Sequence, residues 1–346
     1  MSNQKLFNVA VVGATGAVGE QIIRLLDERN FPIQQLKLLS SARSAGTKLQ
    51  FKGQEITVEE ATADSFRGVD IALFSAGGSI SQELIPQAIE HGTVCIDNTS
   101  AFRMDPDTPL VVPEVNIDRI NEHKGIIANP NCSTIQMVAA LKPLYDRYGI
   151  SRIIVSTYQA VSGAGARAID EMLRQSKEIL AGKDMEPQIL PVGSLPVKHQ
   201  IAFNAIPQID KFTENGFTYE EMKMINETKK ILGDDSLEVT ATCVRIPVVY
   251  GHSESVYVEL KQDFDIEEVK QLIADAPGIV LQDNPAEQQY PLATDAAGKL
   301  ETFVGRVRRD LSNPRGLNMW IVSDNLLKGA AWNAVQIAEY IAIEQE

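Results

Sequence analysis

The chain of 346 residues is long enough for two domains with separate hydrophobic cores. Its formal net charge of −14 argues against nucleic acids and anionic membrane surfaces as partners. The N-terminal apolar run is short and broken by glycines, and no stretch approaches the length of a transmembrane helix, so we expect a cytoplasmic protein. Neither the three cysteines nor the four histidines have the spacing of a metal site, so we expect no metal.

A glycine-rich turn near the N-terminus is the first functional signal. Residues 5–12 read as a buried strand, which runs into the turn Gly13–Gly19 and then into a helix. In this context the phosphates of a dinucleotide bind at the helix N-terminus. The spacing is Gly-x-x-Gly-x-x-Gly instead of Gly-x-Gly-x-x-Gly, so the motif by itself also fits a turn without a ligand. We interpret it as a nucleotide site because of the strand and helix around it.

The end of the second strand indicates which nucleotide binds. This strand, over 36–39, should end near the adenosine ribose, where an NAD site usually offers an acidic residue. Here Arg43 lies among serines, and no Asp or Glu occurs between Asn30 and Gly53. An arginine with hydroxyls can bind a 2′-phosphate, which a carboxylate would repel. We therefore expect NADP, and a solvated polar loop is the alternative.

The order of elements predicts two domains. Strands at 36–39, 69–74 and 93–97 alternate with helices, which predicts a Rossmann-like, doubly wound parallel sheet over residues 1–131. Further strands are expected at 152–161, 237–246, 255–260, 302–308 and 317–322, and helices at 168–180, 219–232 and 266–274. These predict an α+β catalytic domain on a mostly antiparallel sheet over 132–324. The C-terminal segment 325–346, helical over 325–342, is expected to return to the first domain and complete its nucleotide site.

Cys132 follows the apolar run 126–128 and opens an amphipathic helix. At a helix N-terminus, unpaired N–H groups and the helix dipole favour a thiolate. The same N–H groups could stabilise an oxyanion on a carbonyl that the sulfur attacks. The alternative is a small buried hydrophobe, the usual fate of a lone cysteine. Cys95 and Cys243 lie in strand-like runs and are expected in the core.

Several sequence blocks, in order along nearly the whole chain, resemble those of the aspartate-semialdehyde dehydrogenases. The blocks are 13–19, 41–44, 97–103, 129–134, 157–165, 199–204, 220–223, 245–248 and 251–253. The resemblance implies NADP-dependent interconversion of L-aspartyl 4-phosphate and L-aspartate 4-semialdehyde, with inorganic phosphate as co-product. It also implies a homodimer, whose dimerisation surface lies in the second domain, and a role in lysine (diaminopimelate), threonine and methionine biosynthesis.

The resemblance assigns three catalytic roles. Cys132 matches the nucleophile that forms a thioester, and Gln159 matches the residue that orients the substrate. His252 matches the acid/base, and a histidine suits proton transfer near neutral pH. The residues expected to contact NADP are Gly13, Thr15, Gly16, Ala17, Val18, Ser40, Ser41, Arg43, Ser44, Thr47, Ser75, Ala76, Gly77, Ser162, Gly163 and Asn325.

Charged groups of the substrate are matched by charged side chains. In the resemblance, Arg103 and Lys223 match phosphate-binding positions, and Asn131 beside the nucleophile could also contact phosphate. Arg245 matches the clamp on the α-carboxylate, for which its planar fork is suited. Glu220 matches the partner of the α-amino group. Glu220 and Lys223 lie three residues apart on a helix, so an ordinary ion pair between them is the alternative.

Two local patterns point elsewhere. Tyr219 and Lys223 form the Tyr-x-x-x-Lys pair of short-chain dehydrogenases, but position 206 is Ile206, where that class expects a serine. His199 could replace His252 as the acid/base, or could only hydrogen-bond backbone. We favour His252 because of its matched position in a Gly-His-Ser loop after a strand.

Two rival functions remain. N-acetyl-γ-glutamyl-phosphate reductase shares the thioester chemistry and the nucleotide turn, but the acylated nitrogen of its substrate gives a carboxylate such as Glu220 little to bind. The second rival is a catalytically silent NADP-binding protein. The presence of Cys132, Gln159 and His252 together argues against it.

Overall fold

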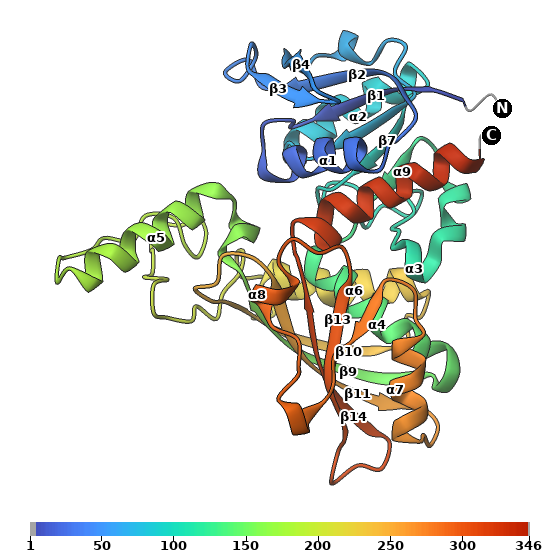
Figure 1. Ribbon diagram of the computed structural model, residues 1–346, viewed down its shortest axis with the longest axis vertical. Coiled ribbons are helices and arrows are strands. Elements are labelled where there is room, and N and C mark those ends of the chain that lie inside the picture. The colour runs from blue at the N-terminus through green and yellow to red at the C-terminus, as the bar shows by residue number, and fades with distance from the viewer. Residues whose placement is uncertain (1–4, 345–346) are drawn as a thin grey trace. The chain divides into compact units, whose positions relative to one another are not determined.

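A computed structural model describes residues 5–344 and divides them into two compact units (Figure 1). One unit runs to Asn131 and takes in the chain again from Gly329, and the other spans Cys132–Lys328. Residues 345 and 346 of the expected C-terminal helix lie outside the described part. Among the described residues, no helix is long and apolar enough to cross a membrane.

The first unit is built on a six-stranded sheet in which every pairing is parallel. The strand order is β5-β2-β1-β6-β7-β8, with β1 (Phe7–Val12), β2 (Ile33–Ser40), β5 (Glu59–Glu60), β6 (Ile71–Phe74), β7 (Val94–Asp97) and β8 (Ile126–Ala128). The chain leaves β1 in one direction through α1 (Ala17–Glu28) and leaves β6 in the other through α2 (Gly78–Glu90). Right-handed crossovers then place α1 and α2 on opposite faces, and α9 (Trp332–Glu344) contacts α1 (Figure 1). The predicted Rossmann-like fold is confirmed.

Short elements complete this unit. A hairpin of β3 (Lys48–Phe51) and β4 (Gln54–Thr57) follows β2, and the predicted elements did not include it. The remaining pieces are η1 (Ala63–Phe66), α3 (Pro113–Asn116) and η2 (Ile117–Glu122). The strand order reverses between β1 and β6, and ligands of open parallel sheets bind at such a reversal.

The second unit carries a mixed six-stranded sheet in the order β10-β9-β11-β14-β13-β12. Its strands are β9 (Ile150–Gln159), β10 (Glu238–Arg245), β11 (His252–Leu260), β12 (Ile279–Leu281), β13 (Thr302–Arg309) and β14 (Gly316–Ser323). The three central pairings are antiparallel and the two outermost are parallel, which confirms the mostly antiparallel prediction. The helices α4 (Cys132–Tyr148), α6 (Tyr219–Leu232) and α7 (Ile266–Ala274) contact this sheet (Figure 1). The other pieces are η3 (Val161–Ala164), α5 (Ala166–Leu180), η4 (Pro285–Glu287), α8 (Ala293–Ala296) and the π-helix η5 (Leu327–Ala331).

Strand β11 differs from its prediction. It begins at His252, three residues before the expected start at Ser255, so His252 lies in a strand and not in a loop. The polar residues Ser253 and Glu254 hide the apolar alternation there, but their backbones pair with β9 on one side and β14 on the other. Pairing with two neighbours satisfies the backbone hydrogen bonds irrespective of side-chain type.

Candidate active site

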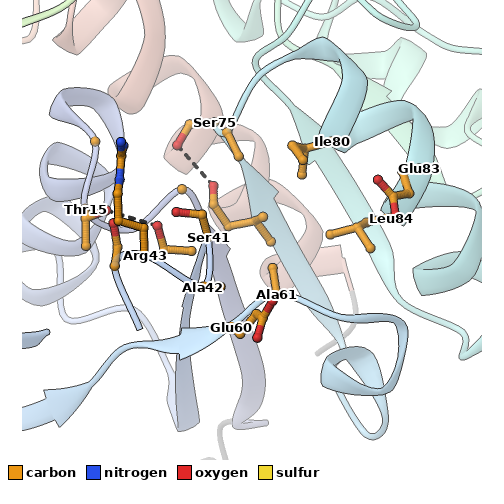
Figure 2. A pocket seen from close by; sticks show the side chains of 16 residues that line it. Thr15, Ser41, Ala42, Arg43, Glu60, Ala61, Ser75, Ile80, Glu83 and Leu84 are labelled. Carbon is orange, nitrogen blue, oxygen red and sulfur yellow. Dashed lines mark hydrogen bonds between the residues drawn. The ribbon is translucent and has the colours of Figure 1, made fainter. Parts of the chain in front are cut away.

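A cavity of about 530 Å³ lies in the first unit at the carboxyl ends of β1, β2 and β6 (Figure 2). Among the residues expected to contact NADP, those that line it are Gly13, Thr15, Gly16, Ser40, Ser41, Arg43, Ser44, Ser75 and Ala76. Ala17, Val18, Thr47 and Gly77 belong to the same unit but are not among its lining residues. Ser162, Gly163 and Asn325 belong to the second unit.

The glycine turn beside this cavity fits a dinucleotide. Gly16 caps α1 without a side-chain hydrogen bond, so an anion can bind the N–H groups of the first turn. A Cβ at Gly19 would lie 2.1 Å from the carbonyl oxygen of Gly13, so the turn and the helix can pack this closely only with glycine there. Figure 2 shows Arg43 on one side of the cavity, across from Ile80 and Leu84.

Seven lining residues were not in the predicted set: Val12, Ala42, Glu60, Ala61, Ile80, Glu83 and Leu84. Residues 80, 83 and 84 have helical spacing on α2 directly after Gly77, and this signal was available in the sequence. Glu60 reaches the cavity because β5 pairs with the end of β2, where Glu60 lies opposite Ser40. Although no acid occurs between Asn30 and Gly53, the fold therefore brings two carboxylates to the same cavity.

Arg103 is held by the backbone in the first unit and is buried. Its Nε donates to the carbonyl oxygen of Asn129 at 3.0 Å, and Nη2 donates to that of Asn98 at 2.7 Å. The preceding turn is organised by Asp97, which accepts hydrogen bonds from the Ser81 hydroxyl and from the backbone N–H of residue 99. Burial raises the pKa of the Asp97 carboxyl. Asn131, the last residue of this part of the unit, is also buried.

Cys132 is the first residue of α4 and is partly exposed, whereas Cys95 and Cys243 are wholly buried as predicted. Burial raises the pKa of both core thiols, which keeps them protonated. Because the thiolate is the nucleophilic form, the position of Cys132 at a helix N-terminus distinguishes it from the other two cysteines.

Gln159 is fixed by hydrogen bonds at both ends of its amide. Oε1 accepts from the Thr157 hydroxyl at 3.0 Å, and Nε2 donates to Glu220 at 3.1 Å. Glu220 also pairs with Lys223 at 3.2 Å, so the ion pair considered from the sequence is present. Lys223 has a second carboxylate partner, Asp210, at 3.2 Å. These contacts join three of the expected site residues into one group, in which Gln159 and Glu220 are buried and Lys223 is partly exposed.

His252 is completely buried, and its tautomer follows from one hydrogen bond. Its Nδ1 accepts from the backbone N–H of Ala160 at 3.0 Å, which places the ring proton on Nε2. Nε2 has no hydrogen-bond partner among the described residues. Burial, followed by the Arg245 charge, lowers the pKa of His252 to about 3, so its imidazole is neutral near pH 7.

Arg245 lies beside the imidazole. Its Nη1 donates to the carbonyl oxygen of Ala160 at 2.7 Å. Burial lowers the pKa of its guanidinium, and the charges of Glu220 and Cys132 act in the opposite direction, which places both near it. A Cβ at Gly163 would lie 2.9 Å from Arg245 Nη1 and 3.2 Å from His252 Nε2, so residue 163 packs directly against the guanidinium and the imidazole.

The turn that leads into β11 is held by Asn325. Its Oδ1 accepts from the backbone N–H of Gly251 at 3.0 Å, and its Nδ2 donates to the Ser162 hydroxyl at 3.0 Å. By contrast, His199 is exposed, and so is Tyr219 of the short-chain dehydrogenase pattern. His252 therefore belongs to the buried group and His199 does not.

Two semialdehyde dehydrogenase models match the chain, the NAD binding domain over residues 8–123 and the dimerisation domain over residues 141–328. The aspartate-semialdehyde dehydrogenase of Bacillus subtilis is 62% identical over 333 residues, which cover 96% of each chain. This chain belongs to the aspartate-semialdehyde dehydrogenase family. The family resemblance stated from the sequence is thus confirmed.

Solved structures of the family agree with this fold. Aspartate semialdehyde dehydrogenase II of Vibrio cholerae, complexed with ASA, has a TM-score of 0.92 at 51% identity, covering 97% of this chain and 98% of that one. The Candida albicans aspartate semialdehyde dehydrogenase with NADP has a TM-score of 0.73 at 25% identity, with coverage of 97% and 98%. The cavity at the glycine turn accordingly lies within an NAD binding domain of a family of oxidoreductases.

Proposed function

We propose that the protein catalyses the NADP-dependent reductive dephosphorylation of L-aspartyl 4-phosphate to L-aspartate 4-semialdehyde, through a thioester on Cys132. One observation carries this proposal. Gln159, Arg245 and His252 form a buried group on one sheet face, and Cys132 opens the helix that packs against that sheet. The names of the relatives support the substrate, and we assign the reaction to amino-acid biosynthesis in the cytoplasm.

The charged residues suit the three charged groups of this substrate. We assign Arg245 to the α-carboxylate, Glu220 to the α-ammonium group, and Lys223 with Arg103 and Asn131 to the phosphate. The ion pair between Glu220 and Lys223 does not prevent this, because each partner has a second contact. Glu220 also accepts a hydrogen bond from Gln159, and Lys223 also pairs with Asp210. If the ion pair opens, each charged group therefore keeps one polar partner. Opening in this way would expose one anion and one cation to the substrate.

In the reaction, the Cys132 thiolate attacks the acyl carbon, and phosphate leaves with the electrons of the broken carbon–oxygen bond. Gln159 holds the acyl group, since its amide is already oriented from both ends. NADPH held at the glycine turn and by Arg43 would supply the hydride that reduces the thioester carbon. The oxyanion then collapses, the carbon–sulfur bond breaks, and Cys132 leaves again as a thiolate.

His252 acts in this scheme as a hydrogen-bond donor. Its Nε2–H donates a hydrogen bond to the oxyanion, and a donor already directed at the developing charge stabilises the transition state. Because a thiolate attacks and a thiolate leaves, reduction needs no net proton transfer to the imidazole. Accepting a proton at Nε2 would require loss of the existing one, and the Ala160 N–H holds that tautomer in place.

Arg43 supports NADP over NAD. It lines the nucleotide cavity next to the hydroxyls of residues 40, 41 and 44. A guanidinium beside hydroxyl donors binds a dianionic 2′-phosphate by charge-assisted hydrogen bonds. The Candida albicans relative was solved with NADP, which agrees with this assignment. Glu60 and Glu83 line the same cavity and can accept hydrogen bonds from other parts of the nucleotide.

We assign the protein to a homodimer through the second unit, which matches a dimerisation domain. The outer face of its sheet exposes Ile154 and Tyr158, which alternate along β9 with buried residues. Large exposed apolar side chains on a sheet face are typical of a protein interface.

The test is phosphate-dependent reduction of NADP by the purified protein, with L-aspartate 4-semialdehyde compared to N-acetyl-L-glutamate 5-semialdehyde. We expect turnover with the first substrate alone and none when phosphate is left out. Turnover with the second alone would overturn the substrate and leave the thioester chemistry intact. If neither reacts while NADPH still binds, the protein is not this enzyme.

A further inference from the structure

A carboxyl group that the proposed reaction does not use lies two residues from His252. Glu254 is on β11, and residues two apart on a strand point to the same face, so its side chain lies on the face that carries the imidazole. Glu254 is completely buried. Neither of its carboxyl oxygens accepts a hydrogen bond from any residue in the described part of the chain.

Among the described residues, no lysine, arginine or histidine side chain pairs with Glu254. Thr157 lies opposite it on β9 and Ile321 opposite it on β14, and the Thr157 hydroxyl already donates to Gln159. Beyond β9, Thr157 lies opposite Cys243 of β10, and the Glu254 charge contributes to the raised pKa of that thiol. From α4, the side chain of Gln136 lies beside the carboxyl.

Only one of the two polar atoms of the Gln136 amide has a hydrogen-bond partner in the described chain. Its Nε2 donates to the backbone carbonyl oxygen of His252 at 3.3 Å, whereas its Oε1 has no donor among residues 5–344. If Glu254 is ionised, two carboxyl oxygens and one amide oxygen are therefore buried near one another without a hydrogen-bond donor. Protonation removes the conflict, because the acid then supplies the missing donor. Burial also raises the pKa of Glu254 well above its ordinary value.

We propose that Glu254 is a positioning residue that, as a neutral acid, donates a hydrogen bond to Gln136 Oε1 and so fastens α4 to β11. The connected groups are the Glu254 carboxyl, the Gln136 amide and the His252 carbonyl, and strand β11 closes the ring from His252 back to Glu254. This inference rests on the proposed roles of Cys132 and His252.

The position of this ring explains why it matters for the reaction. Cys132 is the first residue of α4, and Gln136 follows one turn later on the same helix face. His252 is the first residue of β11. The placement of the nucleophile relative to the hydrogen-bond donor therefore depends on how α4 is seated on β11. Displacements of about 1 Å between reacting groups lower rates by about 100-fold.

The test compares Glu254→Gln and Glu254→Met, with Thr302→Val as a matched control. Thr302 is also buried and its hydroxyl also lacks a partner in the described chain, but it lies on β13, two strands from β11 in the sheet. A glutamine can donate to Gln136 as the neutral acid does, so Glu254→Gln should keep kcat within about threefold of the wild type. Glu254→Met should lower kcat by about 10- to 100-fold with little change in KM.

Three further measurements make the test specific. Rates are expressed per folded chain, determined by circular dichroism, so that loss of folded protein does not count as loss of activity. If Glu254→Met does not fold, Gln136→Met carries the same comparison from the other side of the contact. The infrared band of the protonated Glu254 carboxyl should appear near neutral pH as a difference between the wild type and Glu254→Gln.

Several outcomes would overturn the inference. If Glu254→Gln is as slow as Glu254→Met, the residue acts as an anion. If Glu254→Met retains wild-type kcat, or if Thr302→Val loses as much, the contact does not position the site. Failure of the proposed function is seen separately, as absent wild-type turnover. In that case the infrared band, and slower alkylation of Cys132 in Glu254→Met alone, still decide the inference.

Discussion

Gly163 offers a direct test of how tightly the substrate-facing groups are packed. In Gly163→Ala, the added Cβ would lie 2.9 Å from Arg245 Nη1 and 3.2 Å from both Cε1 and Nε2 of His252. Ordinary contacts of this kind are about 3.5–4 Å, so the imidazole and the guanidinium must each move by several tenths of an ångström. Because a displacement of about 1 Å lowers rates by about 100-fold, we expect kcat to fall by about 10-fold or more. KM for the semialdehyde should rise as well, since Arg245 is the proposed carboxylate clamp.

The assay is steady-state kinetics with L-aspartate 4-semialdehyde, phosphate and NADP. Gly193→Ala is the matched control, because it adds the same methyl group in the same unit, where a Cβ would meet nothing within 4 Å. Overpacking costs about 1–3 kcal/mol of stability, so thermal melts should show both variants folded at the assay temperature. Wild-type kcat and KM in a folded Gly163→Ala would refute the packing argument, and so would equal losses in both variants.

Three further predictions concern single groups. Cys132→Ala should abolish turnover, and turnover in the variant would rule out this nucleophile. In the wild type, substrate should protect Cys132 from alkylation. Cys95 and Cys243 should stay unreactive because burial raises the pKa of both thiols. Arg43→Glu should lower kcat/KM for NADPH relative to NADH by about 100-fold, because charge-assisted hydrogen bonds to the 2′-phosphate are lost. An unchanged ratio of the two kcat/KM values would show that Arg43 does not select the cofactor. The pKa of His252 is lowered from 6.5 to about 3, so between these pH values the unfolded chain binds more protons and the free energy of unfolding falls as pH falls. His252→Gln should lose less stability than the wild type over that interval in denaturant titrations, and equal slopes would contradict the buried neutral state.

Elements with local end signals were predicted closely. The helix expected over 219–232 begins and ends at these residues in the structure. Thr218 forms a capping box with Glu221 at its start, and Gly233 ends it in the left-handed region. The helix expected over 266–274 likewise begins after Asp265, whose side chain accepts from the N–H groups of residues 267 and 268. The alternation of strands and helices in the first unit carried the Rossmann-like prediction in the same way.

Features that depend on distant pairing were not predictable. Glu60 lines the nucleotide cavity only because β5 pairs with β2. The early start of β11 is fixed by β9 and β14, and a reading of local apolar alternation therefore left Glu254 outside the strand. With Glu254 in a loop, nothing indicated that a glutamate and Gln136 of α4 would meet in the core.

The alternation of side chains along a strand relates the predicted site residues to the supporting residues that were not predicted. Gln159 and His252 carry side chains suited to the substrate, and the residues that support them lie two positions away on the same strands. Thr157 donates to Gln159 along β9, and Glu254 lies two residues after His252 along β11. Because side chains on a strand repeat every two residues, a group that faces a site has its nearest same-face neighbour on its own strand at that spacing. Candidate positioning residues can thus be sought two residues from each expected catalytic residue, once the register of the strand is known.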